Sequence, residues 1–292
     1  MKRTSYIILG MLLGGLLLMS GAIFYMSKHG LDSADCELYF TGPQKTFPLP
    51  ECKVLKLVAP RADRTIDGDV DVKRIKEASF VGVPLEVRPA DPLASGGISF
   101  AADLEPFVSI TSTGDTVTIA FAFPSEKLDK RLAGAHWLGV NSQNGMTLSV
   151  SSGVQGIVSG MYDQRTTIRG FERDSLSLSF RHIYHPVVIE ESHFRSLHIL
   201  SGNNWLLNSG SAEKVYFDLD EIGSFTVNAD SFCIDTEYLR GSNDFRYTLQ
   251  KNECRQMFWI PLTEEATLNV KLEAEGKIEL SGRPEPAEQP KK

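Results

Sequence analysis

Short segments in which apolar and polar residues alternate dominate the chain after about residue 50. Alternation places successive side chains on opposite faces of a strand, so each segment predicts a β-strand with one buried and one wet face. Before residue 125 these segments are rich in β-branched and aromatic residues and lie at 53–59, 81–87, 107–112 and 116–123. Thr113-Gly114-Asp115 between the last two predicts a hairpin turn.

Between about residues 146 and 240 the apolar centres of the expected strands recur at an almost constant step of 8 to 11 residues. These centres are Leu148, Ile157, Ile168, Leu178, Ile189, Ile199, Leu207, Phe217 and Val227. Such spacing fits either a solenoid of stacked coils or an antiparallel sandwich. The regular step, and turns without Asn-Gly or Asp-Gly pairs, favour a solenoid with two strands in each coil of about 20 residues.

We therefore expect an all-β body in two parts. A short β-rich region at 51–145, with one or two helical turns at 125–135, leads into a β-solenoid (β-helix) at 146–281. The strands after Gly241 are expected to cap its C-terminal end. The Pro-, Glu- and Lys-rich tail at 282–292 is expected to be disordered.

The N-terminal segment has a different pattern, with no charged residue between Tyr6 and Tyr25. Its length predicts one transmembrane helix at 6–26, which leaves a cytoplasmic stub at 1–5 and a stalk at 27–50. Because Lys2 and Arg3 precede the run, the expected location is the inner membrane, single pass, with the body periplasmic or otherwise outside the cytoplasm. The alternative is a cleaved signal peptide, which the length of the apolar run disfavours.

Charge excludes one class of partner. The chain carries 30 basic and 37 acidic residues. Without Lys2, Arg3 and Lys28, the remaining 27 basic residues against 37 acidic ones give the body a net charge of −10. A nucleic-acid partner would require a basic face, so none is expected.

Four cysteines lie outside the predicted membrane segment, at Cys36, Cys52, Cys233 and Cys254. Their proximity in sequence suggests the disulfides Cys36–Cys52 and Cys233–Cys254, although four cysteines allow three pairings. Four free buried thiols are the alternative. The absence of a CxxC spacing argues against a zinc site.

Polar and aromatic residues on the wet faces of the expected strands supply the candidate ligand face: Asp218, Asp220, His198, Trp205 and Tyr216. The aromatic rings could stack on sugars, although filling a corner of a coil is the favoured interpretation of Trp205. The aspartates, with Glu190 and Glu191, could supply the paired carboxylates of a glycosidase. Surface charge explains the carboxylates equally well. The histidines between His182 and His198, and the acidic turn at 67–71, match no metal-site spacing, so no metal or cofactor is expected.

The phrases FRSLHILSG and TTIRGFERDSLSLSF, the order DLEPFVSITSTGDTVTIAF then MTLSVSSG, and the ending GKIELSGRPEP share a pattern of strands and Ser-Gly turns. In this pattern the chain resembles the bacterial auto-transporter adhesin, head-GIN domain family, over roughly residues 50–285. The resemblance implies a Bacteroidetes-type cell-envelope protein in which a short β-rich segment leads into a β-solenoid, and it implies no catalytic residues.

No GxSxG, HExxH, P-loop or dinucleotide fingerprint occurs in the chain. We therefore expect a membrane-anchored, non-catalytic cell-envelope protein that presents a rigid solenoid for binding or adhesion to a glycan or an envelope protein. Two alternatives stay open: a carbohydrate-active enzyme on a β-helix, and a structural subunit of an envelope complex.

Overall fold

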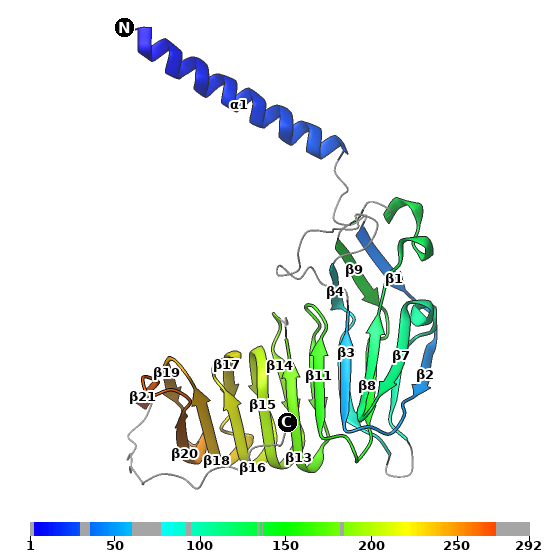
Figure 1. Ribbon diagram of the computed structural model, residues 1–292, viewed down its shortest axis with the longest axis vertical. Coiled ribbons are helices and arrows are strands. Elements are labelled where there is room, and N and C mark those ends of the chain that lie inside the picture. The colour runs from blue at the N-terminus through cyan, green and yellow to red at the C-terminus, as the bar shows by residue number, and fades with distance from the viewer. Residues whose placement is uncertain are drawn as a thin grey trace.

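The computed structural model describes residues 3–29, 36–59, 77–91, 95–132, 135, 137–181 and 184–272. The expected tail at 282–292 and the acidic turn at 67–71 lie outside the described residues. Among the described residues the body is built almost entirely of strands, and one helix, α1 (Arg3–His29), extends away from it (Figure 1).

Most strands belong to one large mixed sheet of 16 strands. Its path runs through β2 (Gln44–Pro48), β6 (Gly97–Ala101), β10 (Met146–Val150), β5 (Leu85–Pro89), β12 (Thr166–Arg169), β14 (Val187–Glu190), β15 (Ser192–Leu207), β13 (Glu172–Phe180), β11 (Gly156–Gly160), β3 (Val54–Val58), β8 (Thr116–Phe121) and β7 (Val108–Thr113). Off this path lie β16 (Gly210–Asp218), β17 (Ile222–Val227), β18 (Phe232–Gly241) and β20 (Cys254–Pro261).

Two smaller sheets flank the large one. Three parallel strands at the N-terminal end are β1 (Glu37–Phe40), β9 (Trp137–Ser142) and β4 (Glu77–Gly82). The pair at the C-terminal end is β19 (Asp244–Leu249) with β21 (Thr267–Leu272). Short 3₁₀ turns occupy Ala102–Phe107, Ser125–Lys127 and Lys130–Leu132, the last two within the segment where helical turns were expected.

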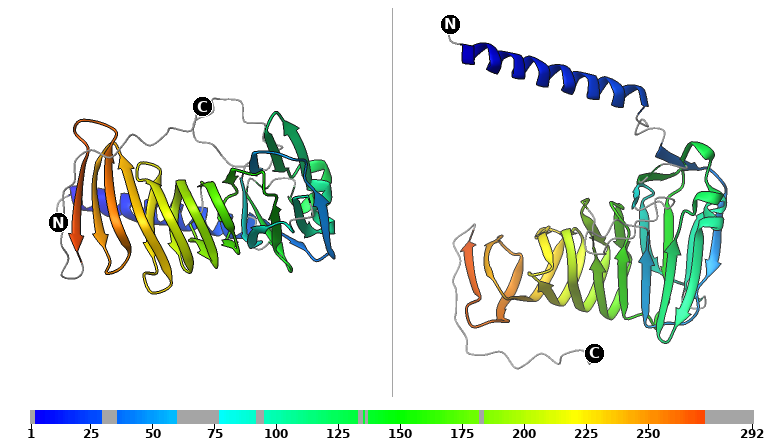
Figure 2. Two further views of the ribbon diagram at one scale, coloured as in Figure 1. Left: turned by 90° about the horizontal axis from the view of Figure 1, so that it is seen from below. Right: turned by 45° about the horizontal axis from the view of Figure 1, so that its top comes forward.

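Strand β15 gives the large sheet its curl. Its first half pairs with β13 and β16, and its second half pairs with β14 and β17. Figure 2 shows the curled sheet from two further directions. Gly202 lies between the halves, in a backbone conformation with φ +145° that favours glycine. The sheet therefore folds over itself and encloses the apolar core.

The core consists of the alternating apolar residues of the strands. On β13, for example, Leu176, Leu178 and Phe180 are fully buried while Ser177 and Ser179 between them are partly exposed. From β13 to β20 the strands pair in parallel with the partner 18 to 22 residues further along the chain, so equivalent positions line up in rows.

The expected fold class, a β-rich N-terminal region followed by a β-solenoid, is wrong. Most of the described strands form one curled mixed sheet in which the two expected parts interleave: β3 pairs with β11, and β5 pairs with β10 and β12. Antiparallel pairs occur at both ends of the sheet path, β2 with β6 and β7 with β8. Alternation identifies strands and their faces but carries no information on which strands pair.

The predicted turn at Thr113-Gly114-Asp115 is confirmed, because β7 and β8 pair antiparallel across it and Gly114 has φ +57°. The expected stalk at 27–50 contains two strands in its described part, β1 and β2.

The predicted membrane anchor at 6–26, and with it the inner-membrane location, is not supported. Within the part of the chain that the structure describes, no helix is long and apolar enough to cross a membrane.

Candidate functional site

The structure keeps His198, Tyr216 and Asp218 on one outer face and places the other two residues of the expected ligand face, Trp205 and Asp220, elsewhere. His198 and Tyr216 stack on each other on the outer face of β15 and β16, with ring centroids 4.5 Å apart and planes at 2°. Asp218 lies further along β16 and accepts a hydrogen bond of 2.6 Å from Arg240. Trp205 is fully buried in the core, where it meets Phe180 edge to face.

Asp220 has a structural role in a turn. Its carboxylate accepts hydrogen bonds from the backbone N–H of Ser242 and the side-chain amide of Asn243. Burial alone would raise the pKa of Asp220, but these hydrogen bonds hold it below its usual value. The carboxylate thus fixes the turn between β18 and β19.

The aromatic residues of the outer face form a ladder, which we define as His198, Tyr216, Tyr238 and Phe258 on β15, β16, β18 and β20. Adjacent rings are 4.5 to 5.3 Å apart and nearly parallel. Burial lowers the pKa of His198 and raises that of Tyr216, with Arg240 and Tyr238 as the second causes. Because each inner ring is covered on both faces by its neighbours, the ladder offers ring edges rather than a flat stacking surface for a sugar.

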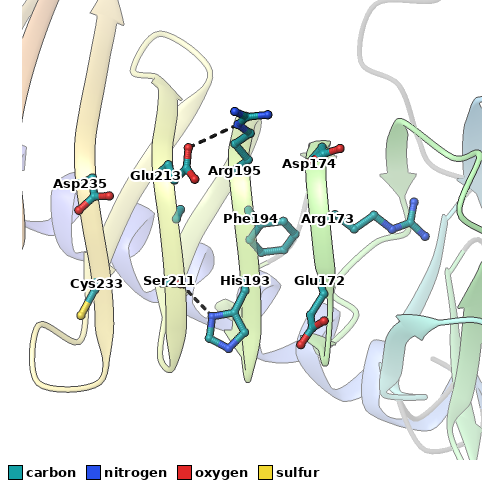
Figure 3. Close-up of a pocket in the computed structure, with 11 residues that line it drawn as sticks. Glu172, Arg173, Asp174, His193, Phe194, Arg195, Ser211, Glu213, Cys233 and Asp235 are labelled. Atoms are coloured by element: carbon teal, nitrogen blue, oxygen red, sulfur yellow. Dashed lines mark hydrogen bonds and ion pairs between the residues drawn. The ribbon is translucent and has the colours of Figure 1, made fainter.

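A groove of about 610 Å³ crosses the same strands near their N-terminal ends. Each of β13, β15, β16 and β18 supplies equivalent positions to it, so its polar side chains form two rows (Figure 3). The first row contains Glu172, His193, Ser211 and Cys233, and the second contains Asp174, Arg195, Glu213 and Asp235. Phe194 and Ala212, both almost fully buried, lie between the rows.

Most charged groups of the second row are paired with each other or with the next strand. Arg195 Nε lies 3.5 Å from Glu213 Oε2, and Arg255 Nη1 on β20 lies 3.3 Å from Asp235 Oδ1. In the first row His193 Nδ1 and Ser211 Oγ share a hydrogen bond of 2.8 Å. The groove therefore offers carboxylates, guanidinium groups, a hydroxyl and an imidazole at regular intervals.

Arg173 anchors the groove from beneath. Its guanidinium donates hydrogen bonds to four backbone carbonyls, those of Val150, Ser151, Ser152 and Val154, at 2.6 to 3.1 Å. Burial lowers its pKa. The side chain thus ties β13 to the turn that follows β10 and holds the first strand of the groove in place.

The four cysteines are free thiols in the structure, so the suggested disulfides are not formed. Cys254 is paired in register with Ile234, which places it one residue out of step with Cys233 on the neighbouring strand. Since alternate residues point to opposite faces, the two sulfur atoms lie on different sides of the sheet.

The histidines and carboxylates weighed in the sequence also stay apart. His182 falls outside the described residues. His185 lies in a turn, with its Nε2 3.6 Å from Asp163 Oδ1. Glu190 forms an ion pair with Arg169. Among the residues that the structure describes, no group of three His, Cys, Asp or Glu side chains could hold a metal ion.

Sequence reasoning missed the groove because it followed only the apolar centres. The charged residues Asp174, Arg195, Glu213 and Asp235 recur at steps of 21, 18 and 22 residues. This spacing, close to that of the paired strands, was the available signal.

No family model matches the chain, and no curated protein matches it. Solved structures with similar folds include a "putative adhesin" from Bacteroides fragilis NCTC 9343, at 12% identity and TM-score 0.43, over 79% of this chain and 93% of that one. A second protein of that description, from Parabacteroides merdae ATCC 43184, has 11% identity and TM-score 0.36, with 80% and 97% covered. A "putative lipid binding protein" from Parabacteroides distasonis ATCC 8503 has 8% identity and TM-score 0.35, with 82% and 98% covered. The head-GIN relationship thus stays a resemblance, and these likenesses assign no role to any residue.

Proposed function

We propose that this chain is a binding protein that holds an extended, neutral, polyhydroxylated ligand, a glycan strand, in the groove across β13, β15, β16 and β18. The observation that carries this proposal is the repetition of the groove: four neighbouring strands present polar side chains at equivalent positions on either side of a narrow apolar strip. With strands about 4.8 Å apart, the rows extend over roughly 14 Å.

The chemistry of the rows favours hydroxyl groups over a charged ligand. The positive charges of Arg195 and Arg255 are balanced by Glu213 and Asp235, so the groove combines many hydrogen-bonding groups with little uncompensated positive charge. Carboxylates accept hydrogen bonds from sugar hydroxyls, and Arg, His and Ser donate to their oxygens. The net charge of −7 also disfavours polyanions such as nucleic acid.

The test is a glycan array followed by calorimetry with the glycan that binds. Replacing both members of a groove ion pair, Arg195→Ala with Glu213→Ala, should lower affinity at least about tenfold, equivalent to about 1.4 kcal/mol. The matched control is Lys45→Ala with Glu105→Ala, an exposed ion pair elsewhere on the surface, which should leave affinity unchanged.

Four results would overturn the proposal. Binding of no glycan at all would remove its basis, and equal losses in the groove and control variants would place the ligand elsewhere. Hydrolysis of a bound glycan that stops in Glu213→Gln would make the chain a carbohydrate-active enzyme. Co-purification with another protein at fixed stoichiometry, without glycan affinity, would instead indicate a structural subunit.

A further inference from the structure

An acidic side chain interrupts an otherwise apolar row inside the curled sheet. The paired inward positions from β13 to β20 are Leu176, Leu197, Val215, Glu237 and Met257. The first three are fully buried, and Glu237 is buried to the same degree. A carboxyl group thus stands where its neighbours on the row are hydrocarbon.

Both carboxylate oxygens of Glu237 are buried without a well-aligned hydrogen bond among the described residues, and the donors beside them are the Cys254 thiol and the Tyr247 hydroxyl. From β16 only the hydrocarbon of Val215 is opposite Glu237 in register. The ionisable groups around it come from the C-terminal strands: Tyr247 on β19, Cys254 on β20, and Glu253 in the turn before β20.

The second carboxylate of this group, Glu253, is held firmly. It is 2% exposed, and it accepts hydrogen bonds from the Tyr247 hydroxyl and, at 2.7 Å, from the backbone N–H of Gln250. Hydrogen bonds donated to a carboxylate favour its charged form. Well-formed hydrogen bonds therefore stabilise the anion of Glu253, whereas for Glu237 the effect of burial outweighs that of the neighbouring Cys254 and Tyr247 donors.

Removing a charge from water without a partner costs several kcal/mol, so a buried carboxyl group in this position favours its neutral form. Burial, and secondly the nearby Glu253, raise the pKa of Glu237 to about 8. Burial, and secondly Glu237, also raise the pKa values of Tyr247 and Cys254. All three groups thus favour the protonated state near neutral pH.

We propose that Glu237, Glu253, Tyr247 and Cys254 form a proton-dependent latch that fastens the C-terminal strands β19, β20 and β21 to the rest of the sheet. With Glu237 protonated the latch is closed. When the carboxylic O–H of Glu237 gives its proton to solvent, two carboxylates share one buried site, and β19–β21 separate from β18 so that water reaches Glu237. No covalent bond other than this O–H changes, and the backbone hydrogen bonds between β18 and β20 break as the strands separate.

The direction of the pH effect follows from linkage. A group whose pKa is higher in the folded than in the opened state stabilises the fold fully below the opened-state value, about 4.5, and loses that contribution as pH rises to about 8. Within this window the equilibrium constant for opening rises about tenfold per pH unit. The latch does not depend on glycan binding, so either proposal can fail without the other.

The experiment is hydrogen exchange measured by mass spectrometry between pH 5.5 and 7.5, corrected for intrinsic exchange rates. In the wild-type chain, protection of residues 244–272 should fall about 100-fold across this range, while β13 stays protected. In Glu237→Gln, whose amide imitates the neutral acid, protection should be independent of pH. The matched control Glu265→Gln, an exposed residue in the turn before β21, should behave like the wild type.

A second variant keeps the test decisive if Glu237→Gln does not fold. In Glu253→Gln the like charge is gone, so the loss of protection should end at a lower pH than in the wild type. The latch would be overturned if protection of residues 244–272 in the wild type did not change with pH. It would also be overturned if either variant showed the same pH dependence as the wild type. Stabilisation by added CaCl₂ or ZnCl₂ at pH 8 that disappears in Glu237→Gln would overturn it in favour of a cation site.

Discussion

The rings of Tyr216 and Tyr238 stack face to face, with centroids 4.5 Å apart and planes at 6°. Parallel pairing of β16 with β18 places the two residues directly opposite each other. Each residue also stacks on a further aromatic side chain, Tyr216 on His198 and Tyr238 on Phe258. The outer face of the sheet is thus stabilised by side chains that touch across strands, in addition to the backbone ladder.

This contact predicts measurable coupling between the two tyrosines. In a double-mutant cycle with Tyr216→Leu and Tyr238→Leu, urea unfolding should give a coupling free energy of about 0.5–1.5 kcal/mol. Tyr216→Leu combined with Phe47→Leu on β2, at the far end of the sheet path, should be additive. Additivity within the tyrosine pair would show that the stacking contributes nothing.

Gly210 should tolerate no side chain. Its φ is +129°, and a Cβ atom there would lie 1.9 Å from the backbone oxygen of Ser192. Gly210→Ala should therefore lower the free energy of unfolding by more than about 3 kcal/mol. Gly114→Ala is the comparison, because Gly114 has φ +57° with open space around it, and should cost about 1–2 kcal/mol. If urea titrations gave the same decrease in unfolding free energy for both variants, Gly210 would not be the position that excludes a side chain.

Arg173→Lys should destabilise the chain although it conserves charge. A lysine ammonium lacks the planar fork that reaches four carbonyls at once, so some carbonyls lose their donor. Loss of hydrogen bonds to a charged group predicts a decrease of about 2–3 kcal/mol in unfolding free energy. Arg181→Lys, in an exposed ion pair with Glu221, should change it by less than about 1 kcal/mol. Similar values for the two variants would argue against the anchoring role.

Maleimide labelling of the native chain should distinguish the cysteines. Cys233 is exposed and should react first, while burial raises the pKa of the Cys254 thiol and makes its reactive thiolate scarce. We expect a rate difference of more than about tenfold, and loss of the fast phase in Cys233→Ser. Intact mass should correspond to four thiols. A Cys233–Cys254 crosslink in peptide mapping would contradict the opposite orientation of the two side chains.

Alternation in the sequence predicted most strands and their buried faces, although the strand expected at 81–87 is divided between β4 and β5. Leu176, Leu178 and Phe180 point inward as expected, and so do Val215 and Phe217. Strand partners were not predictable, because pairing depends on contacts between segments far apart in the chain, such as β3 with β11. Nor did the step of 8 to 11 residues show that Ile199 and Leu207 belong to one strand, β15.

The residues of the candidate site were likewise only partly predictable from the sequence. His198 and Tyr216 were expected on one wet face and do meet there. Trp205 was placed among the ligand candidates with packing as its favoured role, and it is indeed buried, in the inward phase of Leu207 two positions along β15. Glu237 was hidden because two successive residues outside the core, the exposed Asp235 and the half-buried Thr236, shift the alternation of β18. Its inward position could be read only from the register with Val215.

Strand β15 has a consequence for how the molecule comes apart. It is the one described strand that hydrogen-bonds to four others, β13, β14, β16 and β17, so neither half of the curled sheet can be peeled off without disturbing the other. Thermal fluctuations that detach β15 expose both halves of the curled sheet together. The middle of the chain is therefore a single cooperative unfolding unit. Under a pulling force along the chain, resistance should therefore concentrate at β15, with the C-terminal strands yielding first.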